Sequence, residues 1–337
     1  MRAFELQNDF GIDNLVRVTR DEPRAGPGEV MVRMRAASLN YRDLLLVKGH
    51  YNPHLKLPMV PLSDGVGEVT GVGEGVTRVA VGDRVASLFH QGWISGSPAP
   101  DLLSHTLGGP LEGVLRDHVV LHQDGVAKVP EHLSDLEAAT LPCAALTAWS
   151  ALAGEGDVSA GDTVVVQGTG GVSLFALQLA KLMGARVIIT SSSDDKLERA
   201  KALGADHLIN YRTTPQWAKP VLEITDGRGA DHIVEVGGAG TIEQSLRAIR
   251  MDGRIAVIGV LSGVASELPI TLILMKHVRL QGLMVGPRDS FEAMCRAISL
   301  HGMTPTIDRV FGFEEIKDAL RYMGEGRHFG KICIDFG

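Results

Sequence analysis

Short alternations of hydrophobic and polar residues dominate roughly the first 120 positions of the chain. The stretch EVMVRMRAASLN alternates in this way, and glycine or proline breaks most such stretches, which is typical of β-rich irregular structure. One helix is expected over YRDLLLVKG, ending at Gly49. Residues 90–113 are rich in glycine, proline and serine, and we interpret them as a loop that could border a substrate pocket.

After Pro130 the pattern changes to strands that alternate with helices. Residues 134–152 read as helical. Runs of β-branched residues then predict strands at 163–167, 186–190, 207–211, 231–236 and 254–260, and helices are expected at 172–183, 196–203 and 241–249. Strands of this kind alternating with helices imply a parallel sheet covered on both faces. We therefore expect an α/β fold with a doubly wound domain.

The last part of the chain, from about residue 288, returns to mixed character. It ends in HFGKICIDFG, a strand that could rejoin the first domain. The predicted organisation is a β-rich domain of residues 1–126 completed by residues 288–337, and a second domain of residues 127–287.

Length and composition agree with two domains of an ordinary soluble protein. The chain has 337 residues, of which 45% are hydrophobic and 22% charged. A net charge of -7 predicts no nucleic-acid partner, and the absence of a long apolar run or signal peptide predicts no membrane association. Three cysteines lie far apart without a CxxC pair, so no disulfide framework is expected. A cytoplasmic location is the expectation.

A glycine-rich turn, GTGGVS, follows the strand TVVVQ and opens a helix. Gly168 permits a tight turn, and Gly170 lets the backbone approach a pyrophosphate. The amides of Gly170, Gly171 and Val172 would point at the anion from a helix N-terminus. The third position of the fingerprint needs a small side chain, and Ser173 supplies one. We predict a dinucleotide site.

The residues that follow the strand predicted at 186–190 indicate which dinucleotide binds. An NAD site usually has an acidic residue there, for the ribose 2′-hydroxyl. This chain has TSSSDDK instead, so Ser191 and Ser192 offer donors and Lys196 a cation, which suit a 2′-phosphate. Asp194 or Asp195 could still reach a ribose or cap the next helix. We expect NADP(H) in preference to NAD(H).

Seven motifs, in a fixed order from end to end, resemble those of the medium-chain dehydrogenase/reductase superfamily: AASLNYRDL, GDRV, LPCAALTAW, GTGGVS, LGADHLINY, IGV and the terminal GKI. The resemblance is to its zinc-free members related to quinone oxidoreductase and to the zinc-type alcohol dehydrogenase-like branch. It implies a GroES-like catalytic domain, a Rossmann domain and a cofactor bound between them.

The resemblance also bears on zinc. Zinc-dependent members have a catalytic cysteine at the position of Asn40, a histidine at Ser63 and a cysteine at Cys143, so one ligand remains. Residues 83–119 contain no cysteine for a structural zinc lobe. We interpret Cys143 as a small buried helix residue, and four histidines as scattered surface residues: His90, His105, His118 and His122. No metal site is predicted.

Without a Lewis acid, the electrons of a hydride must pass to a substrate that spreads the charge itself, as quinones and α,β-unsaturated carbonyls do. The resemblance places the donors of NYRD at the substrate: Asn40, Tyr41 and Arg42, with Tyr51 also in reach. Arg42 could instead pair with a carboxylate, and the tyrosines could be packing residues with wet hydroxyls. Asp43 is expected to organise a turn.

Further cofactor contacts are implied by the resemblance. Thr147 would lie beside the nicotinamide, Tyr211 near the adenosine phosphate, and Gly330 and Lys331 on the diphosphate side. For Lys331 the alternative is a solvated charge at a strand edge. The predicted set is completed by turn and strand-end residues, some of which could equally be structural: Thr169, Val236, Gly237, Gly259, Val260, Leu283 and Val285.

The function that these observations predict is hydride transfer from NAD(P)H to a quinone or α,β-unsaturated carbonyl. An alcohol or aldehyde dehydrogenase of the zinc type, and an NADPH-binding protein without turnover, are the alternatives. The stretch VRLQGLMVG would lie at a sheet edge, which favours a homodimer or higher homo-oligomer. Trp93 is either a lid over the small-molecule substrate or packed against its own loop.

Overall fold

The computed structural model describes all residues 1–337 as two compact units. The β-rich unit comprises Met1–Leu146 and Gly286–Gly337, and the parallel-sheet unit comprises Thr147–Val285. The first boundary lies later than residue 126, because α2 (Asp135–Ala138) packs against β3 (Glu29–Ser38) and β4 (Asp64–Val72) of the β-rich unit.

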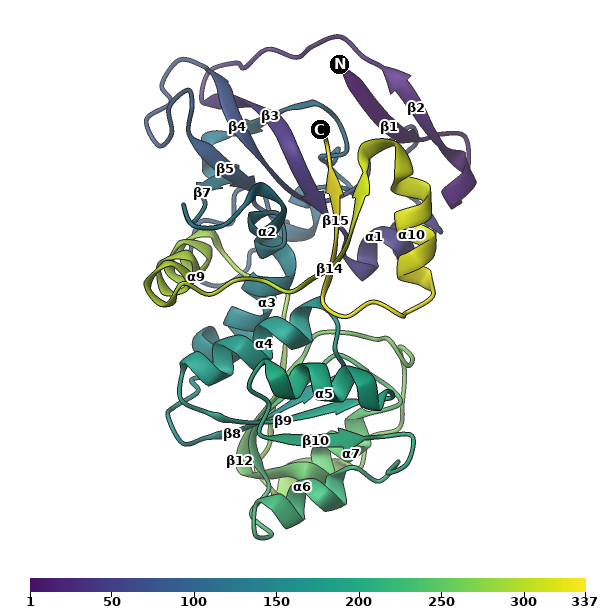
Figure 1. Ribbon diagram of the computed structural model, residues 1–337, viewed down its shortest axis with the longest axis vertical. Coiled ribbons are helices and arrows are strands. Elements are labelled where there is room, and N and C mark those ends of the chain that lie inside the picture. Colours follow the sequence, from purple (N-terminus) through teal and green to yellow (C-terminus); the bar gives the residue numbers. More distant parts are fainter. The chain divides into compact units, whose positions relative to one another are not determined.

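A seven-stranded sheet organises the β-rich unit (Figure 1). Its order is β14-β15-β3-β4-β5-β7, and β6 pairs with β3. The C-terminal strand β15 runs antiparallel to β3, with Cys333 opposite Ser38, so the end of the chain completes this unit as expected. The other bounds are β5 (Arg84–Ser87), β6 (His118–His122), β7 (Val126–Lys128), β14 (Ile307–Gly312) and β15 (Lys331–Asp335). A separate antiparallel pair joins β1 (Arg2–Leu6) and β2 (Leu15–Thr19).

Helices and short turns surround this sheet. They are α1 (Tyr41–Val47), α9 (Arg288–His301) and α10 (Ile316–Gly324), with 3-10 turns η1 (Ile12–Asn14), η2 (Leu102–His105), η3 (Gln123–Gly125) and η6 (Phe313–Glu315). Along β3 the even-numbered residues Val30, Val32 and Met34 are buried, as the alternating pattern predicts. They pack in one core with residues of β15 and α10, such as Ile332 and Leu320.

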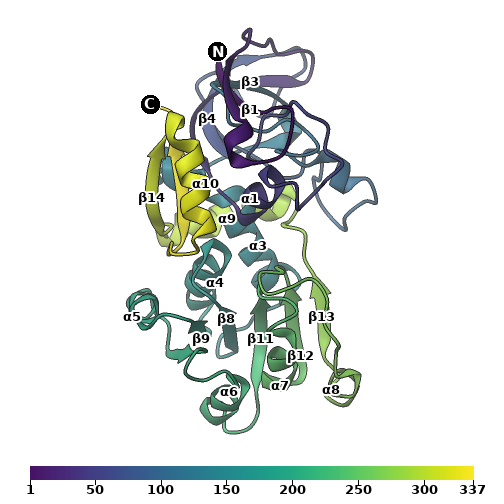
Figure 2. The ribbon, with the colours of Figure 1, turned by 90° about the vertical axis from the view of Figure 1, so that its right-hand side faces the viewer.

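The parallel-sheet unit contains six parallel strands in the order β10-β9-β8-β11-β12-β13. Helix α4 packs on β8 and β9, α5 on β9 and β10, and α7 on β11 and β12 (Figure 2). All five residues of β8 are buried. The predicted doubly wound, Rossmann-type domain is thus confirmed. Its strands are β8 (Thr163–Gln167), β9 (Arg186–Ser191), β10 (His207–Asn210), β11 (Ala230–Glu235), β12 (Ile249–Val257) and β13 (Arg279–Gly282), and its main helices are α4 (Gly171–Leu182), α5 (Asp194–Ala202), α6 (Ala218–Ile224), α7 (Ile242–Ala248) and α8 (Ile270–Met275).

The helical segment predicted at 134–152 is not one regular helix. After α2, the segments η4 (Leu141–Ala145) and η5 (Ser150–Gly154) are π-helical and flank the short α3 (Leu146–Trp149). Pro142 lies in the first turn of η4 and has no N–H for the helical ladder, which accounts for an interruption there.

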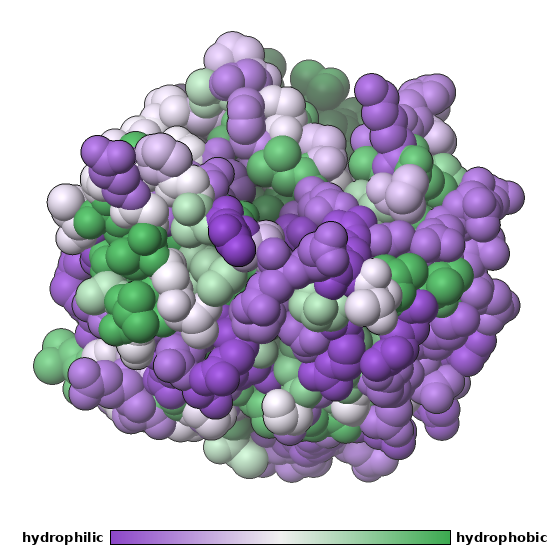
Figure 3. Space-filling view, turned by 90° about the horizontal axis from the view of Figure 1, so that it is seen from above, coloured by the Kyte–Doolittle hydropathy of each residue, from purple (hydrophilic) through white to green (hydrophobic).

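No helix combines the length and the apolar character that a membrane span requires. Hydrophilic residues cover much of the face in Figure 3, with smaller hydrophobic patches between them.

Candidate active site

The predicted phosphate cradle lies at the start of α4. Gly168 follows β8 with φ of 72°, a left-handed conformation that suits glycine, and Gly170 is the N-cap of the helix. A Cβ added to Gly170 would meet no atom within 4 Å, so the space beside this backbone is open. The first N–H groups of a helix have no partner within it. The amides of Gly171 and Val172 are therefore available to a pyrophosphate, and the residues fit a dinucleotide.

Ser173 explains the departure from the glycine fingerprint. Its side chain is buried, and its hydroxyl donates a hydrogen bond of 2.7 Å to the backbone oxygen of Gln167, the last residue of β8. The hydroxyl therefore ties α4 to the strand instead of separating them.

The residues predicted for the adenosine end meet at the carboxyl ends of β9 and β10. Ser191 ends β9, Ser192 follows it, and the amide of Tyr211 donates to the backbone oxygen of Ser191 at 3.1 Å. Lys196 lies in the first turn of α5. The N-cap of α5 is Ser193, and not Asp194 or Asp195 as considered above. Asp194 accepts a hydrogen bond of 2.7 Å from the Asn210 side chain, and Asp195 lies exposed in the first helical turn.

The loops after β11, β12 and β13 gather at the same edge of the sheet, where ligands of doubly wound folds bind. The amide of Ser262 donates to the backbone oxygen of Gly237 at 2.7 Å, and the amide of Leu283 donates to that of Val257 at 3.0 Å. These loops contain the remaining predicted residues of this unit, Val236, Gly237, Gly259, Val260, Leu283 and Val285. The predicted Thr169 lies in the glycine turn, and Thr147 is buried in α3.

Glu235 holds this edge together and was missed by the sequence analysis. This buried carboxylate accepts hydrogen bonds from the Gln167 side chain at 2.6 Å, from Thr241 at 2.5 Å and from the amide of Gly237 at 2.9 Å. It also accepts from Ser245. Glu235 thus links the ends of β8 and β11 to the start of α7. An acidic residue directly after the apolar pair Ile233 and Val234, at the end of the strand, was the available signal.

A second group of polar side chains lies in the β-rich unit. We name it the Asn40 cluster, and it consists of Asn40, Asp43, Ser63, Asp64 and Lys331. The Lys331 ammonium donates to the backbone oxygen of Leu39 and to Asn40 Oδ1, both at 2.6 Å. Asn40 Nδ2 lies 3.4 Å from Ser63 Oγ, and Ser63 donates to Asp64 Oδ1 at 2.7 Å.

Local sequence explains why these residues meet. Asn40 is the N-cap of α1, and its amide donates to Asp43 Oδ2 at 2.8 Å, so Asp43 organises the helix start as expected. Ser63 and Asp64 lie at the start of β4, which pairs with β3, and Lys331 begins β15, which pairs with the other edge of β3. The solvated alternative for Lys331 is wrong, because its side chain is buried with a relative exposure of 3%.

Burial controls the ionisation of this cluster. It raises the pKa of Asp43 to about 6, against the opposing charge of Arg42. Burial also raises the pKa of Asp64, and the charge of Lys331 and hydrogen bonds from Asn40 and Ser63 oppose this effect. The thiol of Cys143 has its pKa raised by burial as well. Cys143 as a whole is half-buried, and its backbone amide donates to Asp64 Oδ2 at 3.1 Å.

The residues at the positions of the zinc ligands do not fit a catalytic zinc. An amide and a hydroxyl occupy two of the positions, and the Lys331 ammonium contacts the amide oxygen directly. Cys143 alone supplies a thiol at these positions, whereas catalytic zinc sites have three protein ligands. No group of three or more histidine, cysteine, aspartate or glutamate side chains is placed to hold a metal ion.

Arg42 is held by the neighbouring loop. Its guanidinium donates to the backbone oxygens of Leu107 and Gly109, each at 2.8 Å. It also stacks on the rings of Tyr51 and Phe89, with 4.9 and 4.7 Å to their centroids. The considered salt bridge with a carboxylate is therefore not how Arg42 is bound. This arrangement brings Tyr51 and the 90–113 loop to α1.

Tyr41, Tyr51 and His90 differ in their exposure to solvent. Tyr41 and Tyr51 have exposures of 45% and 50%, so both are accessible to a substrate. His90 is buried, with edge contacts to the rings of Phe89 and Trp93, so its interpretation as a surface histidine is wrong. Trp93 Nε1 donates to the backbone oxygen of Gly96 at 3.0 Å, which agrees with packing against its own loop.

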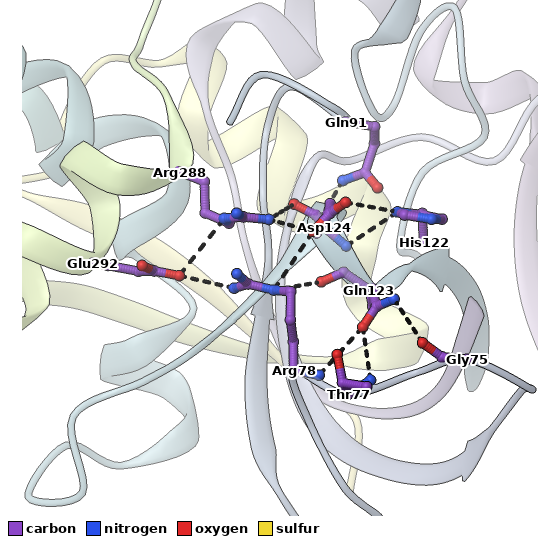
Figure 4. Close-up of polar contacts among 10 residues, drawn as sticks. Gly75, Thr77, Arg78, Gln91, His122, Gln123, Asp124, Arg288 and Glu292 are labelled. Carbon is purple, nitrogen blue, oxygen red and sulfur yellow. Dashed lines mark hydrogen bonds and ion pairs between the residues drawn. The ribbon is translucent and has the colours of Figure 1, made fainter. Parts of the chain in front are cut away.

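The same loop is tied to α9. The amide of Arg288 donates to the backbone oxygen of Trp93 at 2.9 Å. Figure 4 shows the side chain of Arg288 reaching Asp124, at 2.5 Å, and Glu292 of the same helix reaching Arg78, at 2.8 Å. The paired charges leave no net excess of either sign in this network. We interpret it as a structural tie between α9 and the turns of the β-rich unit.

The sequence of this chain matches known proteins over almost its whole length. Residues 26–131 match the family described as alcohol dehydrogenase GroES-like domain, and residues 171–299 match zinc-binding dehydrogenase. A zinc-type alcohol dehydrogenase-like protein of Schizosaccharomyces pombe is 43% identical over 331 residues, covering 96% of each chain.

Solved structures with similar sequences have the same fold as this chain. A Sinorhizobium meliloti protein provisionally named an alcohol dehydrogenase has 45% identity and a TM-score of 0.92, covering 99% of this chain and 98% of that one. An NAD-dependent alcohol dehydrogenase has 36% identity and the same TM-score of 0.92, covering 100% of both chains. With the GroES-like and Rossmann-type sheets described above, these matches show that the chain belongs to the medium-chain dehydrogenase/reductase superfamily of NAD(P)-dependent oxidoreductases.

Proposed function

We propose that this protein is an NADPH-dependent reductase of quinones or α,β-unsaturated carbonyl compounds that works without catalytic zinc. The observation that carries the proposal is the Asn40 cluster, where an amide, a hydroxyl and a buried ammonium stand at and beside the positions of the zinc ligands. Hydrogen-bond donors can stabilise a charge that is spread over an enolate or a hydroquinone more readily than one concentrated on a single alkoxide.

The roles of the residues follow from this chemistry. When bound, the reduced nicotinamide supplies a hydride. As the hydride adds to the β-carbon of an enone, the electrons of the C=C bond move toward the carbonyl oxygen, where the Asn40 amide would donate a hydrogen bond. Water then supplies the proton to the α-carbon. Exposed Tyr41 and Tyr51 would orient the substrate, and Arg42 would hold Tyr51 through its stacking contact. The proposal requires the nicotinamide to reach the Asn40 cluster, as the resemblance to the family implies.

The names of further relatives support both this reading and a rival. An acryloyl-coenzyme A reductase of Metallosphaera sedula is 29% identical over 335 residues, and its name describes an activated alkene as substrate. A quinone oxidoreductase-like protein of Nematostella vectensis is 27% identical over 339 residues. The alcohol dehydrogenases among the relatives favour the rival, a zinc-dependent alcohol dehydrogenase.

The preference for NADPH is part of the proposal. It rests on Ser191, Ser192 and Lys196, because no carboxylate ends β9. A mycobacterial relative with 26% identity is described in complex with NADPH, whereas the NAD-dependent relative favours the other cofactor. Replacing Lys196 with methionine should weaken NADPH binding about tenfold and leave NADH binding within about twofold, measured by nicotinamide fluorescence. Equal losses for both cofactors would contradict a role at the 2′-phosphate.

The deciding experiment is a turnover screen on one purified sample. NADPH and NADH are each tested with quinones, enones, aldehydes and alcohols, and bound zinc is measured in the same sample. We expect reduction of quinones or enones with less than one-tenth of a zinc ion per chain (an approximate threshold set by ordinary contamination). Stoichiometric zinc with alcohol oxidation would establish the rival. Tight NADPH binding with no turnover would indicate a non-enzymatic protein.

We also propose a homodimer formed through the parallel-sheet unit. Strand β13 is an edge of the six-stranded sheet, and most of its residues are exposed. Beside it in sequence, Ile270, Leu274 and Met275 of α8 have exposures of 65%, 74% and 73%. Exposed apolar side chains next to an unpaired strand favour association with a second copy. The cytoplasmic location expected from the sequence stays a prediction.

A further inference from the structure

We propose that Lys331 is a positioning residue for the reduction: its ammonium fixes the orientation of the Asn40 amide and adds a buried positive charge behind it. This inference rests on the proposed function and assigns Lys331 to the substrate side, not to the cofactor diphosphate. All the contacts that support it lie within the β-rich unit.

The contact between the two side chains determines which way the amide faces. Lys331 Nζ lies 2.6 Å from Asn40 Oδ1, and an ammonium can only donate. The amide oxygen must therefore face Lys331, and the NH2 group must face Ser63, whose Oγ lies 3.4 Å from Nδ2, and the Asp64 carboxylate, with which a substrate oxygen would share this donor. A carbonyl oxygen of a substrate needs a donor. It can bind Asn40 only at the NH2 group that Lys331 turns away from itself.

The same contact strengthens the donor. A hydrogen bond accepted by an amide oxygen draws electron density from its nitrogen, and linked hydrogen bonds reinforce one another in a medium of low dielectric constant. Lys331 is 3% exposed and Asn40 is 8% exposed, so solvent screens this effect little. The positive charge lies one amide away from an oxygen bound at Nδ2. It would therefore favour the state in which that oxygen is negative.

The surroundings hold the lysine in this place. A second N–H of the ammonium donates to the backbone oxygen of Leu39 at 2.6 Å. The backbone amide of Lys331 donates to the backbone oxygen of Thr306 at 3.0 Å. The charges that face it are the buried carboxylates Asp43 and Asp64. Two acidic neighbours suit a permanent structural cation, and they partly offset its charge toward any nearby anion, whether a substrate oxygen or a cofactor phosphate.

The experiment compares three variants with the wild-type protein. Lys331→Met keeps the length of the side chain and removes the charge, and Lys331→Arg keeps the charge. The matched control is Lys276→Met, because Lys276 is also partly buried and donates to three backbone oxygens, of Leu246, Arg247 and Ile249. It lies in the parallel-sheet unit. For each protein, thermal unfolding, the Kd for NADPH, and kcat and KM for an enone are measured across pH.

We expect Lys331→Met to lower kcat about 10- to 100-fold, with the Kd for NADPH within about twofold of wild type. Lys331→Arg should recover part of the loss, and Lys276→Met should change stability without changing kcat. A Kd for NADPH raised about tenfold or more, with kcat unchanged at saturating cofactor, would show instead that Lys331 binds the diphosphate. An unchanged kcat and Kd would also overturn the inference.

A second measurement separates this inference from the proposed function. The side-chain amide of Asn40 gives a ¹H–¹⁵N signal pair, assigned by its absence in an Asn40→Ala variant. In NADPH-free protein this pair should shift in Lys331→Met and stay in place in Lys276→Met. If the wild type reduces no quinone or enone but the pair shifts, only the proposed function fails. If the pair does not move, the contact itself is refuted.

Discussion

Asp43 shows how strongly the Asn40 cluster depends on ionisation. Burial raises the pKa of this carboxyl to about 6, whereas an unfolded chain has about 3.9. Well below about pH 3.9 both states are protonated, and the full stabilisation is present. Between about pH 4 and pH 6 the unfolded state is ionised while the folded state still holds the proton, so this contribution to stability is lost as pH rises through the folded pKa.

The prediction concerns Asp43→Asn. Asparagine keeps an acceptor for the Asn40 amide but does not titrate, so the variant should not show this loss. Between pH 4 and pH 7 the free energy of unfolding of the wild type should fall by about 2 kcal/mol relative to the variant. Urea unfolding at several pH values measures the difference, and parallel curves would contradict it.

Single residues were predicted from the sequence only where a local motif marks them. Asn40, Arg42 and Ser63 could be singled out in this way, and so could the glycine turn. The bond from Lys331 to Asn40 spans 291 positions, and no local pattern signals it. The burial of His90 was also missed, because it depends on contacts with Phe89 and Trp93 that the sequence does not show.

Among the elements, the pairing of β14 with β15 depends on one glycine. Gly330 precedes β15 with φ of 90°, and a Cβ there would lie 2.4 Å from the backbone oxygen of Thr306. The amide of Lys331 donates to the same oxygen at 3.0 Å, so the close approach belongs to the strand pairing. A glycine is required here by both conformation and space.

We therefore expect Gly330→Ala to be more destabilising than Gly326→Ala. Gly326 also has a positive φ, of 66°, but a Cβ there meets nothing within 4 Å. The control should cost about 1–2 kcal/mol for the left-handed conformation alone. Gly330→Ala should cost about 1–3 kcal/mol more, from the overlap with Thr306. Chemical unfolding measures both, and equal losses would show that the backbone shifts without penalty.

Strands and helices were predicted well where the pattern is strong. The strands of the parallel sheet have central runs of β-branched and apolar residues, and their existence followed from that pattern. The break in the helical segment predicted at 134–152 was missed, since Pro142 was not taken as an interruption. The exact N-cap of α5 was missed as well, because Ser193, Asp194 and Asp195 are all suitable capping residues.

At the scale of the whole molecule, two units and the return of the C-terminal strand to the first unit could be predicted from changes in the sequence pattern. Strands alternate with helices after Pro130, and the pattern becomes mixed again from about residue 288. The first boundary could not, because the helical segment that follows Pro130 packs on β3 and β4 through contacts distant in sequence. The substrate and the oligomeric state depend on surfaces that bind other molecules. Such surfaces leave few recognisable patterns in a single sequence.

The proposed dimer gives a prediction at this scale. Replacing Leu274 with aspartate should weaken association at least about tenfold, because a charge would be buried at the contact. Leu300→Asp is the control: Leu300 is 81% exposed on α9 and lies in the other unit. Sedimentation velocity over a range of concentrations measures the association. Loss of the dimer in the control but not in Leu274→Asp would place the interface elsewhere.

The position of β15 has a consequence for biosynthesis. A ribosome completes residues 147–285 before it reaches residues 331–335, so the parallel-sheet unit has its entire sequence while the β-rich unit still lacks a strand. Until that strand is translated, Asn40 lacks its contact with Lys331, and the edge of β3 at residues 36–38 is open to pairing with other nascent chains. Strand β15 thus supplies the missing sheet neighbour and the Lys331 amine together, after the whole parallel-sheet unit has been synthesised.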